Sequence, residues 1–238
     1  MSKLIYNFVL LITYLSSLAA QVEHPADTVM TSNKTSITEK VLVAPIALWQ
    51  RISYSTPLLE CQFYPSCSNY AAQSIAEKGI FKGTIMAADR IVRCNPAAYQ
   101  YHLRDRLVIL TSEETFYKDG RLIDPVLKSL PDQHNGKSPF LAAAFSSLIP
   151  GSGRIYAGRI WDGIFGFLTF SISTKLAYSH LKKGHQIRGG LFSFAALAFY
   201  GGEILGAYRA AKTTPSPTSH KHHKDPNAHD EITREVSH

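Results

Sequence analysis

Apolar and polar residues are strongly segregated along this chain of 238 residues. Apolar residues concentrate in residues 1–20 and 139–208, whereas residues 211–238 are almost wholly polar. Between these extremes, apolar residues recur at helical steps of three or four in residues 41–53 and 80–93. The pattern predicts a mainly α protein with three parts: a small three-helix domain containing the cysteines, a C-terminal membrane helical hairpin, and a disordered tail.

The N-terminal stretch, residues 1–20, has one early lysine, an apolar run from Leu4 to Leu18, and small residues at its end. These features are typical of a cleaved signal peptide, with an uncleaved membrane anchor as the alternative. Either one predicts export of the chain after residue 20. Residues 21–40 are rich in serine and threonine and show no apolar period, so we interpret them as a linker.

Residues 41–53 predict an amphipathic helix with Pro45 in its first turn and with Gln50 and Arg51 opposite the apolar face. That face has two interpretations. In the first, the face lies in the membrane interface with its tryptophan at headgroup depth. In the second, it packs on the helices of the cysteine region. We favour the second, because so small a domain needs this helix to cover its apolar side chains. Both hold if the face is wide. The candidate membrane-contact residues are Ile46, Trp49 and Ile52.

All three cysteines of the chain fall within residues 61–96. Pro65 favours an extended conformation for Tyr64 before it, and the hydroxyl of Ser68 has the chemistry of a helix N-cap. The helix after Ser68 is expected to end just before Gly79, because glycine readily takes the positive φ that closes a helix.

A second helix is expected over residues 80–93. Its apolar face consists of Phe81, Ile85, Ala88 and Val92. Its charged residues lie off that face, at Lys82, Asp89, Arg90 and Arg93. The basic ones, with Lys78, are candidates to face lipid phosphates or an acidic partner. A plain solvated face is the alternative.

The spacing Cys-x-Phe-x-Pro-Ser-Cys-Ser-x-Tyr, with Gly-x-x-Lys-Gly and Arg-Cys-Asn-Pro after it, resembles the membrane protein insertion efficiency factors, the YidD family. The resemblance covers about residues 41–96. It implies a small, basic, non-enzymatic helper that works beside the insertase of the bacterial inner membrane. The motif positions are Cys61, Phe63, Pro65, Cys67, Ser68, Tyr70, Gly79, Lys82, Gly83, Arg93, Cys94 and Pro96.

Residues 97–121 depart from the family pattern. Family members reach a short Gly-x-Asp-Pro-Val tail soon after the third cysteine, whereas here Leu122-Ile-Asp-Pro-Val126 comes only after an insertion. We therefore assign residues 41–130 to this domain. Within the insertion, residues 106–110 and 115–117 predict a small β-hairpin of unknown function.

Residues 138–210 form the expected membrane region. A Pro-Gly-x-Gly-x-x-Tyr-x-Gly string beginning at Pro150 is similar to small two-helix membrane domains of the TM2 or DUF5683 type. A phosphate-binding loop is the rival interpretation, but no Lys-Ser/Thr pair and no preceding strand supports it. Helices over residues 163–174 and 189–202 are expected, with a basic loop over residues 181–188. Crossing a bilayer requires the charged residues of this region to lie near the interfaces or to face protein: Asp162, Lys175 and Glu203.

The formal charge of +7 suits an anionic membrane or a nucleic acid, and no zinc-finger or RNA-binding signature supports the second. The tail at residues 211–238 contains four clustered histidines, which invite a metal hypothesis. We interpret it instead as an unstructured polar tail, and we expect no bound cofactor.

Three interpretations compete for the cysteines. As zinc ligands they lack a well-spaced fourth partner, so no metal site is expected. As a nucleophile, Cys67 would have its thiolate stabilised by the helix N-terminus. However, no histidine and carboxylate occur in a recognisable catalytic pattern. We favour structural roles, as small buried side chains or as a Cys61–Cys67 or Cys67–Cys94 disulfide.

The sequence thus predicts a non-enzymatic factor that contacts membrane lipids, an insertase and its client proteins, and no nucleic acid. A thiol-dependent enzyme or a membrane-lytic, haemolysin-like factor is the alternative. We expect the bacterial inner membrane as its location. The signal-like N-terminus places the cysteine domain in the periplasm, whereas typical family members lie at the cytoplasmic face.

Overall fold

The structure is a computed structural model that describes residues 24–54, 61–101, 116–126 and 137–213. The expected signal peptide, the first strand of the expected hairpin and the histidine-containing tail therefore lie outside the described residues. The chain divides into two compact units, which we call the cysteine unit, residues 1–94 with 116–127, and the hairpin unit, residues 95–115 with 128–238.

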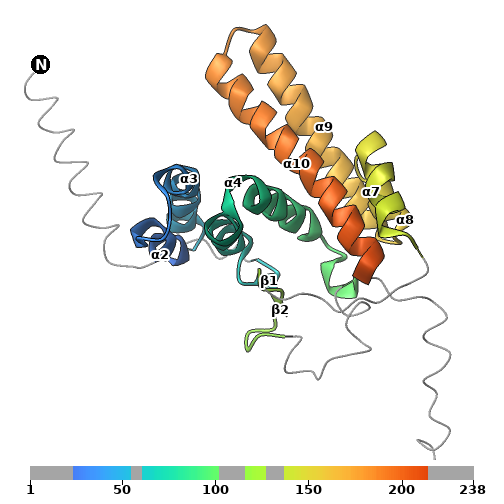
Figure 1. Ribbon diagram of the computed structural model, residues 1–238, viewed down its shortest axis with the longest axis horizontal. Helices are drawn as coiled ribbons and strands as arrows, with labels where there is room; N and C mark the ends of the chain where they lie inside the picture. The colour runs from blue at the N-terminus through green and yellow to red at the C-terminus, as the bar shows by residue number, and fades with distance from the viewer. Residues whose placement is uncertain (1–23, 55–60, 102–115, 127–136, 214–238) are drawn as a thin grey trace, which may run out of the picture. The chain divides into compact units, whose positions relative to one another are not determined.

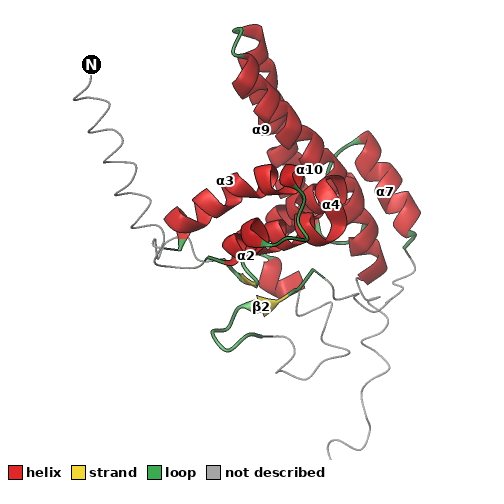
Figure 2. Cartoon of the chain, turned by 60° about the vertical axis from the view of Figure 1, so that its left-hand side comes forward, coloured by secondary structure: helices red, strands yellow, loops and turns green. Residues whose placement is uncertain are grey.

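Helices dominate both units, which confirms the mainly α class (Figures 1 and 2). The cysteine unit contains α2 (Pro25–Thr31), α3 (Ile37–Ser53), α4 (Cys67–Arg93), β1 (Phe63–Tyr64) and β2 (Leu122–Ile123). The hairpin unit contains α7 (Pro139–Leu148), α8 (Ser152–Tyr156), α9 (Ile160–Lys182) and α10 (Gln186–Thr213).

The prediction of a linker over residues 21–40 is wrong where the structure describes this stretch. Helix α2 buries Ala26 and Val29 in a core shared with α3 and α4. Helix α3 then starts with Ser36 as its cap, in a reciprocal pair of hydrogen bonds with Glu39. Because α3 begins this early, Pro45 lies inside the helix and not in its first turn.

Helix α4 breaks at Gly79, whose φ of 74° and ψ of 173° are not helical. The break divides α4 into the two helical segments expected from the sequence. They pack closely, since a Cβ on Gly83 would lie 2.4 Å from the carbonyl oxygen of Ser74. The expected cap is wrong by two residues: Ser66, not Ser68, caps α4, and its hydroxyl accepts from the amide of Asn69.

A two-residue parallel pairing joins β1 to β2, with Phe63 opposite Leu122. The pairing returns the chain to the cysteine unit after the insertion, and the rings of Tyr64 and Tyr117 stack with centroids 3.7 Å apart. The Asp-Pro-Val stretch after β2 thereby lies beside the cysteine motif. Of the expected hairpin, the described part shows a bridge between Phe116 and Leu122.

Helices α9 and α10 form the hairpin, and α7 and α8 pack against it (Figure 1). The turn is shorter than the loop expected over residues 181–188, because α9 continues to Lys182 and α10 starts at Gln186. Small residues allow close contact: a Cβ on Gly153 would lie 1.9 Å from the carbonyl oxygen of Ala142, and one on Gly166 would lie 2.1 Å from the carboxyl group of Glu203.

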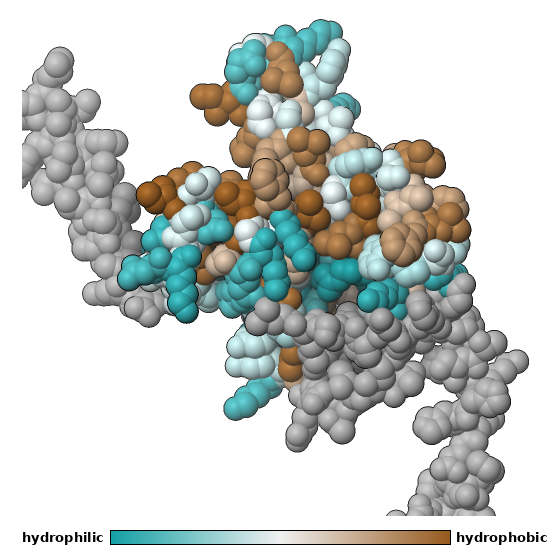
Figure 3. Space-filling view, viewed as in Figure 1, coloured by the Kyte–Doolittle hydropathy of each residue, from teal (hydrophilic) through white to brown (hydrophobic). Residues whose placement is uncertain are grey.

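Large apolar side chains reach the surface of both units, seen as brown areas in Figure 3. By length and composition, α10 is the one helix among the described residues that could cross a membrane. Helix α7 is apolar but short.

Candidate functional site

Helix α3 has apolar residues on two sides. Its inner side buries Val43 and Ala47 against α2 and α4. Its opposite side, which we call the outer face of α3, exposes a second apolar set. Trp49 is 50% exposed and Ile37 is 81% exposed. The outer face of α3 consists of Ile37, Val41, Leu48, Trp49 and Ile52.

The structure separates the three candidate membrane-contact residues. Ile46 is partly buried and packs on the core, as the packing interpretation expects. Trp49 and Ile52 point outward on the outer face of α3. The wide-face alternative, in which one helix both packs and exposes apolar surface, describes this arrangement.

Gln50 was expected opposite the apolar face with Arg51, and for Gln50 this is wrong. Its side chain is fully buried. Its amide oxygen accepts from the backbone N–H of Ala26 at 2.9 Å, and its nitrogen donates to the Ser68 hydroxyl at 3.2 Å. Gln50 therefore links α3 to α2 and α4 through hydrogen bonds. Ser68 serves as its hydrogen-bond partner on α4 and not as the helix cap.

Phe81 was assigned to the apolar face of its helix, yet it is 86% exposed. Ala88 and Val92 of the same predicted face are buried, together with Met86 and Ala87. Lys78 and Lys82 are exposed as well, so the described surface near Gly79 combines one aromatic ring with two basic side chains.

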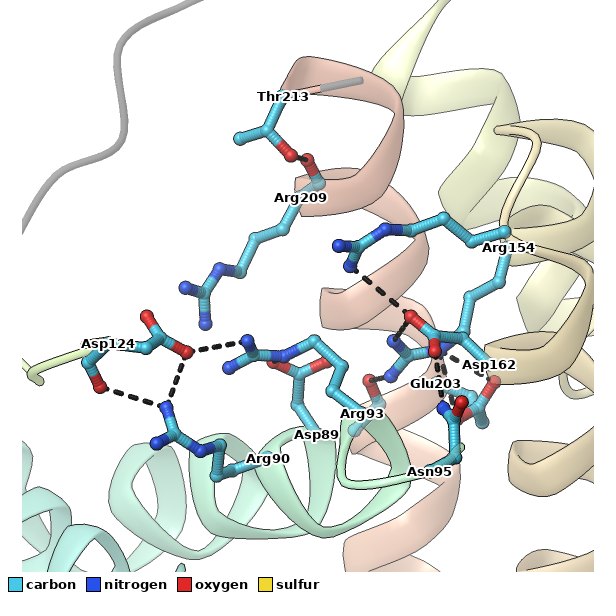
Figure 4. A network of polar contacts seen from close by, with 12 residues as sticks. Asp89, Arg90, Arg93, Asn95, Asp124, Arg154, Asp162, Glu203, Arg209 and Thr213 are labelled. Atoms are coloured by element: carbon cyan, nitrogen blue, oxygen red, sulfur yellow. Dashed lines mark hydrogen bonds and ion pairs between the residues drawn. The ribbon is translucent and has the colours of Figure 1, made fainter. Parts of the chain in front are cut away.

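The expectation that Arg90 and Arg93 belong to a basic surface is wrong, because both are buried. Figure 4 shows their polar contacts. Arg90 bonds the carboxylate of Asp124 and donates to the carbonyl oxygens of Asp124 and Pro65, at 2.8 and 3.1 Å. Arg93 donates to Asp124 at 2.6 Å and to Asp89 at 3.0 Å. Although burial acts against the charge, the carboxylates of Asp124 and Asp89 hold the pKa of Arg93 well above its usual range.

Two aromatic motif residues complete this site. The guanidinium carbon of Arg90 lies 3.9 Å from the ring centroid of Phe63 and 4.8 Å from that of Tyr70. Sequence reasoning noted Asp89 and the Asp-Pro-Val stretch but did not pair them with the arginines. The Asp-Pro-Val stretch is a family feature that the insertion displaces along the sequence. It was the signal from which a role for Asp124 could have been predicted.

The three cysteines converge, although they are distant in sequence. The sulfur of Cys61 lies 3.1 Å from that of Cys67 and 4.0 Å from that of Cys94, and all three lie within 4.8 Å of one another. Each is half-buried and free, so neither of the two alternative disulfides is present. The amide of Cys67 donates to the sulfur of Cys61 at 3.3 Å.

Deprotonation of the cluster is concentrated on one thiol. Hydrogen bonds from the thiols of Cys67 and Cys94 lower the pKa of Cys61 to about 2, against the opposing effect of burial. Their hydrogen bonding to Cys61 is in turn the first cause that raises the pKa of Cys67 and of Cys94. Within the part of the chain that the structure describes, no histidine or carboxylate joins this group.

The hairpin unit has its own buried ionic cluster, also shown in Figure 4. Arg154 donates to Glu203 at 3.0 Å and to the carbonyl oxygen of Gly202 at 3.1 Å. Asp162 accepts from Asn95 at 2.6 Å and pairs with Arg159 at 3.2 Å. Asp162 and Glu203 thus face protein, one of the two conditions set for a membrane hairpin. Lys175 is exposed.

Comparison with known proteins finds similarity in the cysteine region. Residues 38–102 match the model of the YidD family, described as "Putative membrane protein insertion efficiency factor". Proteins with that description include one from Herpetosiphon aurantiacus, 49% identical over 59 residues, which are 25% of this chain and 85% of the relative. Another, from Thermoanaerobacter pseudethanolicus, is 43% identical over 60 residues, 24% of this chain and 84% of the relative. No solved structure matches the chain.

Proposed function

This chain belongs to the membrane protein insertion efficiency factor family, and on that premise we propose that it assists the insertion or assembly of membrane proteins at a bilayer, as a non-enzymatic factor beside an insertase. The proposal covers the cysteine unit, which contains most of the matched residues. The similarity of the hairpin unit to two-helix membrane domains remains a prediction.

The observation that carries the proposal is the outer face of α3. Isolated exposed apolar residues are ordinary on a protein surface, but a continuous set marks an interaction site. Here five large apolar side chains line one side of one helix, while the opposite side is occupied by the core. A helix that rests on a rigid unit and exposes such a face suits the boundary between headgroups and acyl chains.

The hairpin unit supplies the anchor in this proposal. Helix α10 has the length and composition to cross the bilayer, and the two acidic residues of the described stretch 137–213, Asp162 and Glu203, are buried and paired with arginines. Membrane proteins pair their buried ionisable residues in this way. We propose the bacterial inner membrane as the location.

A test uses the two tryptophans of the full-length protein in lipid vesicles. Trp161→Phe leaves Trp49 as the single tryptophan, and its fluorescence is expected to be quenched by brominated lipids. A double Trp49→Ser and Ile52→Ser variant is expected to fold and yet to lower the yield of an inserted client protein severalfold. Each side chain contributes about 1.5–3 kcal/mol when it is buried in an apolar medium.

Ile91→Ser is the matched control, because Ile91 is an exposed apolar residue of α4 outside the outer face. It should leave the client yield unchanged. Trp49 fluorescence could be insensitive to brominated lipid while the double variant lowers the yield. This result would mean that the outer face of α3 contacts a protein partner and not lipid. An unchanged yield in the double variant would refute the role of this face.

Sidedness is proposed from the signal-like N-terminus, which favours a periplasmic cysteine unit. Intact cells treated with a membrane-impermeant thiol reagent, after mild reduction, are expected to show labelled cysteines. Labelling that appears only after the inner membrane is broken would instead establish the cytoplasmic face, where typical family members lie.

A further inference from the structure

The three cysteines occupy structurally fixed positions at the edge of the cysteine unit. Cys61 precedes β1, Cys67 is the first residue of α4, and Cys94 comes directly after its last residue. Because α4 folds back at Gly79, its two ends come together and bring Cys67 and Cys94 close. The chain between Cys61 and Cys67 is held by Arg90, which binds the Pro65 carbonyl oxygen.

These thiols are poorly suited to simple core packing. The apolar core of the unit is formed by other residues around α2, α3 and α4, and none of the cysteines belongs to it. All three sulfurs instead lie together, half-exposed, with each thiol near two others. Three soft donor atoms in one place, on a scaffold fixed by ion pairs, are the features of a metal site.

The size of the sulfur triangle fits one metal ion. Zinc–sulfur bonds of about 2.3 Å separate the ligand sulfurs of a tetrahedral site by about 3.8 Å. The Cys61–Cys94 distance of 4.0 Å is close to this value, and every sulfur lies within 4.8 Å of the others. The Cys61–Cys67 separation of 3.1 Å must widen for both sulfurs to bind the same ion.

We propose that Cys61, Cys67 and Cys94 bind a single thiophilic metal ion of the class of Zn²⁺ and Cu⁺ through three thiolates. Thiolate ligands select these ions among the metals of the cell. Cu⁺ would be held by the three sulfurs alone, whereas Zn²⁺ would take a water molecule as its fourth ligand on the exposed side. The amide of Cys67 donates to the Cys61 sulfur and orients that ligand.

A disulfide is the competing use of the same residues. A Cys61–Cys67 bond would need the two sulfurs to approach from 3.1 Å to about 2.05 Å, and it would leave Cys94 without a partner. A metal ion can bind all three thiols at once, whereas a disulfide joins only two. The convergence of three thiols therefore favours a metal ion over a disulfide.

The test uses full-length reduced protein in detergent, without oxygen, titrated separately with Zn²⁺ and Cu⁺. We expect one tightly held ion per chain after desalting, and loss of reactivity of all three thiols toward a chromogenic thiol reagent. Co²⁺ in place of Zn²⁺ is expected to give a sulfur-to-cobalt charge-transfer band. Cys61→Ser, Cys67→Ser and Cys94→Ser should each weaken binding by about a hundredfold or more.

The histidines of the C-terminal tail provide the matched control. A variant with all five tail histidines changed to alanine is expected to retain the ion, which excludes the tail as its source: His220, His222, His223, His229 and His238. X-ray absorption of the metal-loaded wild type should show three sulfur neighbours at about 2.3 Å. This measurement decides the question even if a cysteine variant fails to fold.

Two results would overturn the proposal. One is reduced wild-type protein whose thiols stay fully reactive in the presence of either ion. The other is a Cys61–Cys67 disulfide, found by mass spectrometry after cells are quenched with an alkylating reagent, in a protein that takes up no metal after reduction.

Discussion

The two units bury opposite kinds of apolar side chain. The cysteine unit encloses large residues, with Phe63, Tyr70 and Leu122 among its fully buried side chains. Over residues 137–213, by contrast, every buried apolar side chain is an alanine, and many large ones are exposed. The exposed set in that region includes Phe140, Leu148, Phe167, Leu191 and Leu197.

This difference corresponds to the packing rules of two different solvents. In water, burial of large apolar side chains drives folding, so they gather inside. In lipid the outside is equally apolar, and helices associate through small residues that allow close approach. The small buried side chains of the hairpin unit match the second rule, as its proposed membrane location requires. The core of the cysteine unit obeys the first, and the outer face of α3 is its largest described exception.

Both units also bury arginine–carboxylate pairs, but with different surroundings. Arg90 lies between aromatic rings and backbone carbonyls of a loop-rich region. Arg154 lies among helices packed through glycine and alanine. In each case the sequence distance between partners is large, 34 residues for Arg90–Asp124 and 49 for Arg154–Glu203.

The largest effect is expected in the cysteine unit, from Asp124→Asn. The change leaves Arg90 and Arg93 buried without their shared carboxylate, and removing one partner of such a network costs about 3–5 kcal/mol. We expect the amides of α4 to lose protection from hydrogen exchange in the full-length protein, while α9 and α10 keep theirs.

Asp119→Asn is the control for this prediction. Asp119 also pairs with an arginine, at 2.6 Å, but the pair is exposed, and exposed pairs contribute about 0–1 kcal/mol. Equal loss of protection in the two variants would mean that the buried network does not stabilise the unit more than a surface pair.

A smaller effect is expected in the hairpin unit, from Gly166→Ala. The added Cβ would lie 2.1 Å from the Glu203 carboxyl group, and overpacking of this kind costs about 1–3 kcal/mol. The midpoint of thermal unfolding in detergent should fall. Gly190→Ala is the control, because no atom lies within 4 Å of its new Cβ, and it should keep or raise the midpoint. Equal shifts would show that α9 and α10 do not depend on close approach.

The smallest effect is expected at the exposed basic residues near Gly79. Lys78→Gln and Lys82→Gln should each weaken binding of the cysteine unit to anionic vesicles by about fivefold at low salt, since one lysine near such a surface contributes about 1 kcal/mol. Binding to neutral vesicles should not change. Lys34→Gln, exposed before α3, is the control. An equal loss from Lys34→Gln would indicate attraction through net charge alone.

The sequence by itself determined the local features of this protein. The helical periods, the break at Gly79 and the two-helix hairpin all result from nearby residues, because a glycine or a run of apolar positions acts on its own segment of backbone. The spacing of the cysteine motif likewise led to the family, which the comparisons confirm.

Only the tertiary structure decided which polar residues are buried. Periodicity placed Gln50, Arg90 and Arg93 on polar faces, yet each lies inside. A buried charge or amide depends on a partner that no local pattern reveals, such as Asp124 beyond a long insertion or the amide of Ala26 from α2. For the same reason the sequence did not predict the convergence of Cys61, Cys67 and Cys94. The break in α4 at Gly79 and the β1–β2 pairing bring segments together that are distant in sequence.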